Sequence, residues 1–362
     1  MYIKQASLRG FRNLGQLDME LKNGLNIFYG NNAQGKTNFL ESLYVCAMGR
    51  SQRTRMDEQM VGFEEMESHI RLMIQKEYYV DRIDVHLKRQ EKKGIAINGI
   101  PIRKSGELFG TLQVVIFSPE DLNLIKGGPS ERRRFMDMEI CQLSRIYYYD
   151  LQQYYRSLKQ RNHLLKQIQN KPSLEDTLYP WDEQLAEFGG RIIRARREFL
   201  GKLNDISSKK QLSLTGGLDD LQIEYKPNCP EGIFFEKLRK NTKRDIVFGA
   251  TQNGPHKDDM GFMIHGNDVK TYGSQGQQRI TALSAKLAEI DLIEEETGQK
   301  PVLLLDDVLS ELDEKRQNYL MEGISGMQSI LTCTGIEDSV KKYVKDAFLF
   351  YVENGKIQRK WE

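Results

Sequence analysis

Hydrophobic and polar positions alternate over short runs in the first hundred residues, a pattern typical of half-buried β-strands. The Asn98-Gly99 pair adds the signature of a tight hairpin turn. A segment at about 35–48 has helical spacing and interrupts these strands. The predicted strands are YIKQASLRGF, GQLDMEL, GLNIFYG, HIRLMIQ, YYVDRIDVHLK, GIAING and, before Pro119, LQVVIFSPEDL.

The pattern changes to helical periodicity in the middle of the chain, from Arg132 to about Ile168 and from Trp181 to Ile206. Apolar residues recur there at three- and four-residue steps, so each segment has one apolar face. The connecting NKPSLEDTLYP is predicted to be a loop, and the two helices to pack as an antiparallel pair. Core packing is the expected use of their five tyrosines: Tyr147, Tyr148, Tyr149, Tyr154 and Tyr155.

Strand patterns return after about residue 245. Strands alternating with helices around a continuous apolar run indicate a sheet buried on both faces. The chain is therefore predicted to be one α/β domain with halves at 1–125 and 246–362, split by a helical arm at 126–245. The late strands are DIVFGA, DMGFMIHG, KPVLLLDDVLSELD, MQSILTCTG and AFLFYVENGKIQ.

Composition supports a globular chain of 362 residues, with 39% hydrophobic and 29% charged residues. No apolar run approaches the roughly 20 residues of a membrane span, and the first residues lack a secretory signal. The four cysteines have no CxxC spacing, which favours reduced thiols and a cytoplasmic protein. A net charge of +2 gives no argument for nucleic acid, so any basic surface must be local.

Residues 30–37, GNNAQGKT, match the phosphate-binding loop G-x-x-x-x-G-K-[ST] between a predicted strand and a predicted helix. The glycines let backbone N–H groups curl around a phosphate, and the helix N-terminus adds positive charge. Lys36 is expected to reach the β- and γ-phosphates of ATP, and Thr37 to bind Mg²⁺. The predicted ATP-binding residues are Gly30, Asn31, Asn32, Ala33, Gln34, Gly35, Lys36 and Thr37.

A carboxylate for the same Mg²⁺ is predicted at Asp306, which ends the apolar run VLLL. Asp307 follows on the other side of the pleat and is the candidate to orient or deprotonate the attacking water. Lys36 and Asp307 are thus the predicted catalytic residues. The wide separation of the two motifs along the chain indicates an ATPase head interrupted by an arm. Thr242–Asp245 also match a guanine-reading motif, but their polar context predicts a solvated turn and makes GTP the disfavoured nucleotide.

The order of the phosphate loop, FSPEDL, helical insertion, SQGQQ and LLLDD resembles the heads of ABC-type ATPases of the SMC class. In that class, a polar loop at a helix N-terminus grips the γ-phosphate of ATP bound to the opposite subunit. The resemblance implies this role in trans for Ser274, Gln275, Gly276 and Gln277, with the helix starting near Gln277. The alternative is an ordinary linker.

PEDLNLIKGGPSERRRFMD (119–137), NGPHKDD (253–259), YGSQGQQR and LLLDDVLSELD together resemble the RecF family of bacterial recombination mediators. The resemblance implies an ATP-dependent homodimer that binds single-stranded and duplex DNA at gaps and junctions. It further implies weak, DNA-stimulated ATP hydrolysis, action with RecR and RecO, RecA loading and no membrane partner.

Some positions depart from the patterns of these ATPases. Lys257 stands where arginine is usual, Asp307 where transporters have glutamate, and Thr334 where they have a histidine. Glu120 or Asp121 would have to replace a missing glutamine.

Candidate DNA contacts are the basic residues Arg50, Arg53 and Arg55, and a second run, Lys88, Arg89, Lys92 and Lys93. A solvated surface is the common alternative for such runs. Three other functions remain open: a transporter ATPase, an ATP-driven nuclease of the overcoming-lysogenization type, and a structural SMC-like protein. The short arm and the short segment after Asp306 disfavour the last two.

Overall fold

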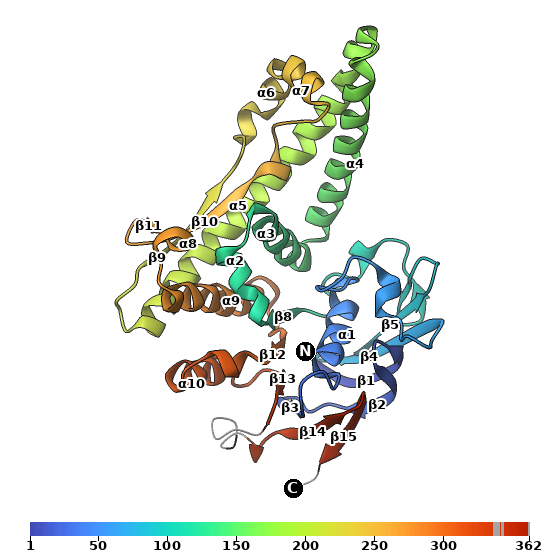
Figure 1. Cartoon of the computed structure of the whole chain (residues 1–362), viewed down its shortest axis with the longest axis vertical. Helices are drawn as coiled ribbons and strands as arrows, with labels where there is room; N and C mark the ends of the chain where they lie inside the picture. The colour runs from blue at the N-terminus through green and yellow to red at the C-terminus, as the bar shows by residue number, and fades with distance from the viewer. Residues whose placement is uncertain (336–340, 342–343, 361–362) are drawn as a thin grey trace. The chain divides into compact units, whose positions relative to one another are not determined.

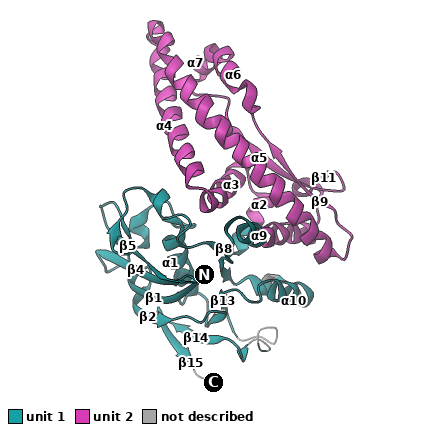
Figure 2. Ribbon diagram, turned by 180° about the vertical axis from the view of Figure 1, so that it is seen from behind, with its two compact units in different colours: residues 1–121, 289–362 teal, residues 122–288 magenta. Residues whose placement is uncertain are grey.

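The computed structural model describes residues 1–335, 341 and 344–360. The chain forms two compact units, residues 1–121 with 289–362 and residues 122–288 (Figure 2). Segment 246–288 therefore groups with the helical insertion, whereas the sequence-based division assigns it to the second half of the head.

A six-stranded sheet forms the centre of the first unit, in the order β15-β14-β3-β13-β12-β8. All neighbouring pairs are parallel except β14–β15, a terminal hairpin. The central β12 and β13 are buried at every position, as the apolar runs predict. The strands are β3 (Leu25–Tyr29), β8 (Val114–Phe117), β12 (Val302–Asp306), β13 (Ser329–Cys333), β14 (Phe348–Glu353) and β15 (Lys356–Lys360).

A second sheet in this unit is fully antiparallel, in the order β2-β1-β4-β5-β6-β7. Its alternation of buried and exposed residues leaves one face to solvent. The predicted Asn98-Gly99 turn is confirmed, with positive φ at both residues. The strands are β1 (Tyr2–Phe11), β2 (Leu14–Glu20), β4 (Glu67–Gln75), β5 (Val80–Lys88), β6 (Gly94–Ile97) and β7 (Ile100–Pro101).

The helices of the first unit are short. The α1 helix ends at Gly49, whose φ of 66° is the left-handed conformation that glycine tolerates best. The α10 helix begins after Asp313, whose carboxylate accepts the backbone N–H of Arg316. Among the described residues, the helical segments of this unit include α1 (Lys36–Met48), the last part of α9 (Gln275–Thr297), α10 (Glu314–Gly323) and the 3₁₀ turns Asp57–Met60, Ser105–Glu107 and Val308–Glu311. The turn Pro119–Leu122 crosses the boundary between the units.

The second unit contains the predicted helix pair, α4 (Arg145–Ile168) and α5 (Tyr179–Thr215), which run side by side in Figure 1. The predicted loop between them contains the 3₁₀ turn Pro172–Leu178. Tyr147 and Tyr154 are buried as expected, but Tyr149 and Tyr155 are exposed, so the tyrosines are not all core residues. The remaining elements are α2 (Asn123–Lys126), α3 (Pro129–Leu143), β9 (Leu221–Lys226), the 3₁₀ turn Glu231–Ile233, α6 (Phe234–Lys240), α7 (Thr242–Phe248), the 3₁₀ turn Pro255–Lys257, β10 (Asp259–Ile264), β11 (Asn267–Asp268), α8 (Val269–Tyr272) and the first part of α9 (Gln275–Thr297).

Two predictions for the segment after residue 240 are wrong. DIVFGA is not a strand, since Thr242–Phe248 form α7. Asp245 is not in a solvated turn, because its carboxylate is buried and accepts a hydrogen bond of 2.7 Å from Nη1 of Arg161. Arg161 also donates through Nε to Asp182 at 2.6 Å. The polar sequence around Asp245 reflects a buried ion network, which local patterns do not reveal.

A second buried arginine, Arg196 on α5, links α5 to two other segments of the second unit. Its guanidinium donates to Asp137 of α3 at 2.8 Å and to Asp258 at 3.0 Å. Asp258 belongs to the NGPHKDD motif, so part of that motif is explained by this network.

Candidate nucleotide-binding site

The phosphate loop connects β3 to α1 in the first unit and takes a shape that requires glycine at both ends. Gly30 has a φ of 152°, and a Cβ atom there would lie 2.2 Å from the carbonyl oxygen of Val352. Gly35 has a φ of 117°, and its Cβ would lie 2.9 Å from Oδ1 of Asn13. Ala33 between them also has a positive φ, 63°. The loop therefore curls tightly, which is how successive N–H groups can be turned toward one anion.

Lys36 starts α1 and points back into this curl. Its Nζ donates to the carbonyl oxygens of Gly30 at 2.6 Å and Asn31 at 2.8 Å. Burial lowers the pKa of Lys36, while Asp307, Cys333 and Asp306 oppose this effect. The amine thus lies within the cradle where a phosphate chain is expected.

Thr37 and Asp306, which are 269 positions apart in sequence, are in direct contact. The Thr37 hydroxyl donates to Oδ1 of Asp306 at 2.9 Å. Parallel pairing of β3, β13 and β12 brings the start of α1 and the carboxyl end of β12 to the same edge of the sheet. A hydroxyl and a carboxylate are oxygen ligands that suit Mg²⁺, so these two residues fit a magnesium site.

Thr332 of β13 supports this edge and was not identified from the sequence. Its hydroxyl donates to Oδ1 of Asp306 at 2.8 Å and accepts the backbone N–H of Asp307 at 3.0 Å. The residue is almost completely buried. A threonine within an apolar strand is not unusual, so the sequence alone does not single out Thr332. Its role in holding Asp306 and Asp307 becomes visible only once β12 is paired with β13.

Asp307 leaves the strand in the left-handed conformation, with a φ of 53°. The direction of its side chain is therefore set by this turn, whereas the sequence pattern predicts that the pleat of the strand sets it. Burial raises the pKa of the Asp307 carboxyl, and the nearby Lys36 opposes the rise. A carboxylate less acidic than usual, close to the phosphate-binding lysine, is consistent with a proton-accepting role.

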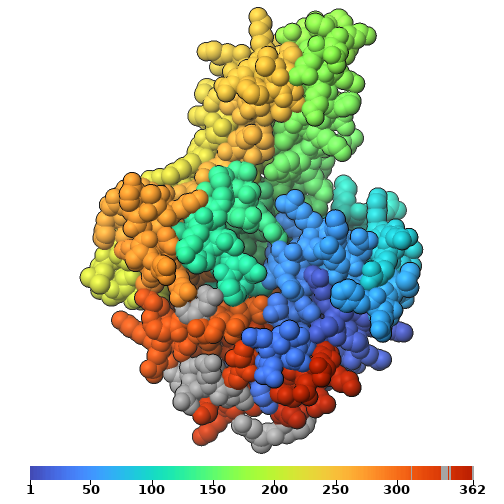
Figure 3. All heavy atoms as spheres, in the orientation of Figure 1, coloured from blue at the N-terminus to red at the C-terminus, as the bar shows by residue number. Residues whose placement is uncertain are grey.

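The β14–β15 hairpin braces the phosphate loop. Oε1 of Gln34 accepts the backbone N–H of Asn354 at 2.6 Å, and the Gln34 carbonyl accepts that of Gly355 at 3.0 Å. A Cβ atom on Gly355 would lie 2.0 Å from the carbonyl oxygen of Asn13. Figure 3 shows the red C-terminal strands against the blue N-terminal segments. Gln34 thus acts as a structural residue of the loop through its contacts with the hairpin.

The candidates for the missing glutamine differ in their surroundings. Oδ2 of Asp121 accepts the backbone N–H of Ser118 at 2.8 Å and so closes a turn. Glu120 is exposed. Of the two residues, Glu120 is therefore the better candidate for a contact in the nucleotide site.

The candidate DNA-binding arginines are not equivalent. Arg53 donates to Asn38 at 2.8 Å and to the fully buried Glu41 at 3.2 Å, which Arg12 also contacts at 2.7 Å. All three arginines, Arg50, Arg53 and Arg55, are exposed.

The second basic run is similarly mixed. Arg89 donates to the carbonyl oxygens of Glu65 and Gly62, and Lys93 pairs with Asp57 at 2.9 Å. Lys88 is partly buried, and Lys92 is exposed. Several of these cations therefore have structural contacts of their own.

The SQGQQ segment lies in the second unit and starts α9 at Gln275, two residues earlier than predicted. The Ser274 hydroxyl accepts the backbone N–H of Gln277 at 3.2 Å, and Oε1 of Gln277 accepts that of Ser274 at 3.0 Å. This reciprocal pair is a capping box, which explains the earlier start. Ser274 and Gln275 are exposed, and Gly276 is partly exposed. Gln277 also donates to Asp219 at 3.2 Å.

The described part of the chain contains no helix long and apolar enough to cross a bilayer.

Comparison with known proteins gives one consistent result. Residues 2–357 match the family model described as the RecF/RecN/SMC N terminal domain. The DNA replication and repair protein RecF of Lachnoclostridium phytofermentans is 48% identical over 99% of this chain and 100% of its own length. RecF of Lachnospira eligens is 49% identical, with 99% of each chain covered.

Solved structures agree with the sequence relatives. The recombination mediator RecF in its ATP-bound form, described as part of the RecFOR pathway, has a TM-score of 0.92 and 37% identity, covering 99% of this chain and 98% of that one. The Smc head domain of Pyrococcus furiosus has a TM-score of 0.56 and 14% identity, covering 99% and 96%, which shows a shared fold only. The predicted fold, an ABC/SMC-type P-loop ATPase head with a helical insertion, is confirmed. The chain belongs to the RecF family of DNA replication and repair proteins.

Proposed function

We propose that this chain is an ATP-driven DNA-binding switch of recombinational repair, acting in the cytoplasm. The observation that carries the proposal is the cradle in the first unit, where Lys36 fills the phosphate loop and Thr37 contacts Asp306. The similar solved structure, an ATP-bound recombination mediator of the RecFOR pathway, supports the choice of ATP as the nucleotide and of recombinational repair as the process.

Each residue of the cradle has a role that follows from its position. Lys36 would exchange its two carbonyl contacts for phosphate oxygens, which bind the ammonium more strongly because they are charged. Thr37 and Asp306 would hold Mg²⁺, which supplies charge neutralisation at the β- and γ-phosphates. Asp307 would accept a proton from the attacking water. Slow turnover is proposed because aspartate has a shorter reach than glutamate.

Ser274, Gln275, Gly276 and Gln277 are proposed to bind the γ-phosphate of ATP held by a second copy. The N-terminal end of α9 supports this role, because its exposed serine and first turn can present N–H groups and a positive helix dipole to an anion. ATP would then drive homodimerisation, and hydrolysis would reset the monomer.

DNA binding is proposed to follow dimer closure, since two copies of a basic surface would act together. Arg50, Arg53 and Arg55 are the proposed contacts because all three are exposed, although Arg53 also pairs with a buried carboxylate. Gaps and single-strand/duplex junctions are the proposed targets, with RecO and RecR as partners and RecA loading as the outcome. Full-length similarity to RecF proteins favours this reading over a transporter ATPase or a structural SMC-like protein.

Fluorescence anisotropy with labelled gapped DNA tests the proposal. With ATP and Mg²⁺, the wild type should bind DNA more tightly than with ADP, and the affinity should fall steeply with salt. Lys36→Met should abolish the ATP effect, whereas Lys4→Met, a control at an exposed position of β1, should not. Equal DNA affinity of the wild type with ATP, ADP and no nucleotide would contradict the switch.

A further inference from the structure

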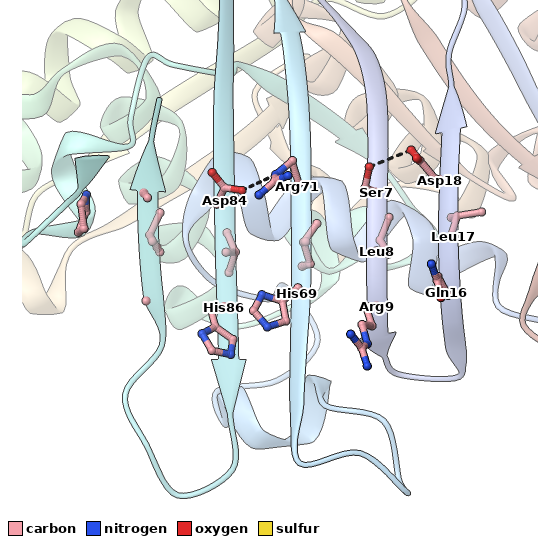
Figure 4. A pocket seen from close by; sticks show the side chains of 16 residues that line it. Ser7, Leu8, Arg9, Gln16, Leu17, Asp18, His69, Arg71, Asp84 and His86 are labelled. Carbon is pink, nitrogen blue, oxygen red and sulfur yellow. Dashed lines mark hydrogen bonds and ion pairs between the residues drawn. The ribbon is translucent and has the colours of Figure 1, made fainter. Parts of the chain in front are cut away.

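Two histidines and a glutamate meet on the solvent-exposed face of the antiparallel sheet in the first unit. Glu67 and His69 are two residues apart on β4, so both point to the same face. His86 of β5 lies directly opposite His69 in the strand register and shares that face. Figure 4 shows the two imidazole rings next to each other on neighbouring strands.

The three side chains converge through their polar atoms. Nε2 of His86 lies 3.0 Å from Oε2 of Glu67, and Nε2 of His69 lies 3.6 Å from Oε1 of the same carboxylate. The potential ligand atoms all lie within 4.8 Å of one another. Zn²⁺ binds nitrogen and oxygen ligands at about 2.0–2.2 Å, which places tetrahedral ligands roughly 3.3 Å apart. The two N···O distances, 3.0 and 3.6 Å, lie on either side of that value.

The site faces a shallow trough of about 580 Å³ along the sheet. Four of its other polar residues are already paired, since Arg71 pairs with Asp84 at 2.6 Å and Ser7 donates to Asp18 at 2.9 Å (Figure 4). The side chains of Glu67, His69 and His86 are 51%, 50% and 34% exposed. A bound ion would therefore keep a position open to water or to another ligand in the trough.

The neighbouring charges limit the affinity. Arg9 lies opposite His69 on β1, and Lys88 lies opposite Glu67 on β5. Both cations oppose the binding of a further positive charge, although Lys88 also pairs with Glu91 at 3.6 Å. Without a metal, the same residues form a stacked histidine pair, with ring centroids 3.9 Å apart, hydrogen-bonded to a carboxylate.

We propose that Glu67, His69 and His86 form a surface site for a divalent transition metal of the zinc class. Two imidazoles and one carboxylate are the donor set that Zn²⁺ accepts in sites with an open fourth position. Mg²⁺ and Ca²⁺ prefer oxygen ligands and should not compete. Since the ligands come from two neighbouring strands, binding would also clip β4 to β5.

Zn²⁺ titration of the untagged full-length protein by calorimetry tests the proposal. Excess Mg²⁺ should be present so that the oxygen ligands of the nucleotide site are occupied, and ATP is left out because its phosphates would bind Zn²⁺ themselves. The wild type should bind one equivalent, and EDTA should reverse the binding. His69→Gln and His86→Gln should each weaken it at least about tenfold, because losing only a hydrogen-bond partner of a metal ligand already costs about 10–100-fold. His265→Gln, a control in the second unit, should bind as the wild type does.

Co²⁺ spectroscopy of the wild type gives a second result that does not depend on a variant remaining folded. Bound Co²⁺ should show visible bands of a nitrogen- and oxygen-ligated ion without thiolate charge transfer, since the four cysteines are buried. No Zn²⁺ binding by the wild type, or unchanged binding by both histidine variants, would overturn the proposal and leave only the stacked pair. Thiolate bands would overturn it by assigning the ion to cysteine.

Discussion

Thr332→Val should damage the edge of the sheet that carries Asp306, the carboxylate proposed to bind Mg²⁺. Valine has nearly the same shape as threonine, so the substitution leaves no cavity and preserves the preference for a strand. It removes the hydrogen bond of 2.8 Å to Asp306 and leaves the N–H of Asp307 without its 3.0 Å acceptor. A hydrogen bond to a charged group contributes about 1.5–3 kcal/mol, and an unsatisfied buried donor costs about 1–3 kcal/mol. Because Thr37 still contacts Asp306, we expect a combined loss of about 2–4 kcal/mol.

Hydrogen exchange measured by mass spectrometry on peptides covering β12 and β13 can detect this loss within the first unit. A loss of 2–4 kcal/mol corresponds to roughly 30- to 700-fold faster exchange where opening is local. Affinity for Mg²⁺-ATP should fall as well, because the carboxylate is less well oriented.

Thr332→Ser is the matched control for the hydroxyl. This variant keeps both hydrogen bonds and loses one buried methyl group, which should lower the stability by about 0.8 kcal/mol. Faster exchange of similar size in both variants, or a change below about 1 kcal/mol for valine, would refute the assigned role of the hydroxyl.

Three further predictions concern Asp307, the proposed proton acceptor, and the buried charged or titratable residues Arg161 and His256. Asp307→Asn should retain Mg²⁺-ATP through Thr37 and Asp306 but accumulate as an ATP-bound dimer, and a wild-type rate of phosphate release would rule out Asp307 as the base. Arg161→Met should destabilise the second unit by about 3–5 kcal/mol in denaturant titrations, because the buried Asp245 would lose the cation that Arg161 provides and Asp182 would keep only its 3.5 Å pair with Arg239; a loss below about 1 kcal/mol would contradict this. Burial lowers the pKa of His256 from 6.5 to about 4. The unfolded chain therefore binds the proton more readily than the folded chain does. About 3 kcal/mol of folding stability should be lost as the pH falls from 6.5 to 4. His256→Gln should flatten that part of the pH profile, and an unchanged slope would show that His256 is not its source.

The local motifs of the candidate nucleotide site could be predicted from sequence because the local backbone geometry or chemistry at each position requires a particular residue type. Gly30 and Gly35 are required by backbone geometry, and Asp306 ends a strand whose apolar run is unmistakable. Thr332 and Gln34 were missed as structural supports because their roles depend on partners that strand pairing and the terminal hairpin supply.

The division of the chain was harder to predict for a similar reason. Residues 246–288 return to strand patterns, but β10 pairs with β9 of the insertion and not with the central sheet. The sequence pattern does not predict the α7 helix, because the burial of Asp245 depends on Arg161, which lies 84 positions away. Local sequence patterns predict which apolar side chains are buried, but they do not predict buried ion pairs between residues far apart in the sequence.

Mixing two defective variants tests the central proposal, ATP-dependent dimerisation through a loop acting in trans. Ser274→Arg keeps an intact phosphate loop, and Lys36→Met keeps an intact SQGQQ segment. With ATP and Mg²⁺, neither variant alone should dimerise in light-scattering measurements of mass. An equimolar mixture should partly recover the dimer mass, because it can form one complete composite site. Dimerisation of Ser274→Arg alone to the wild-type extent, or no recovery in a mixture of folded variants, would contradict a trans-acting loop.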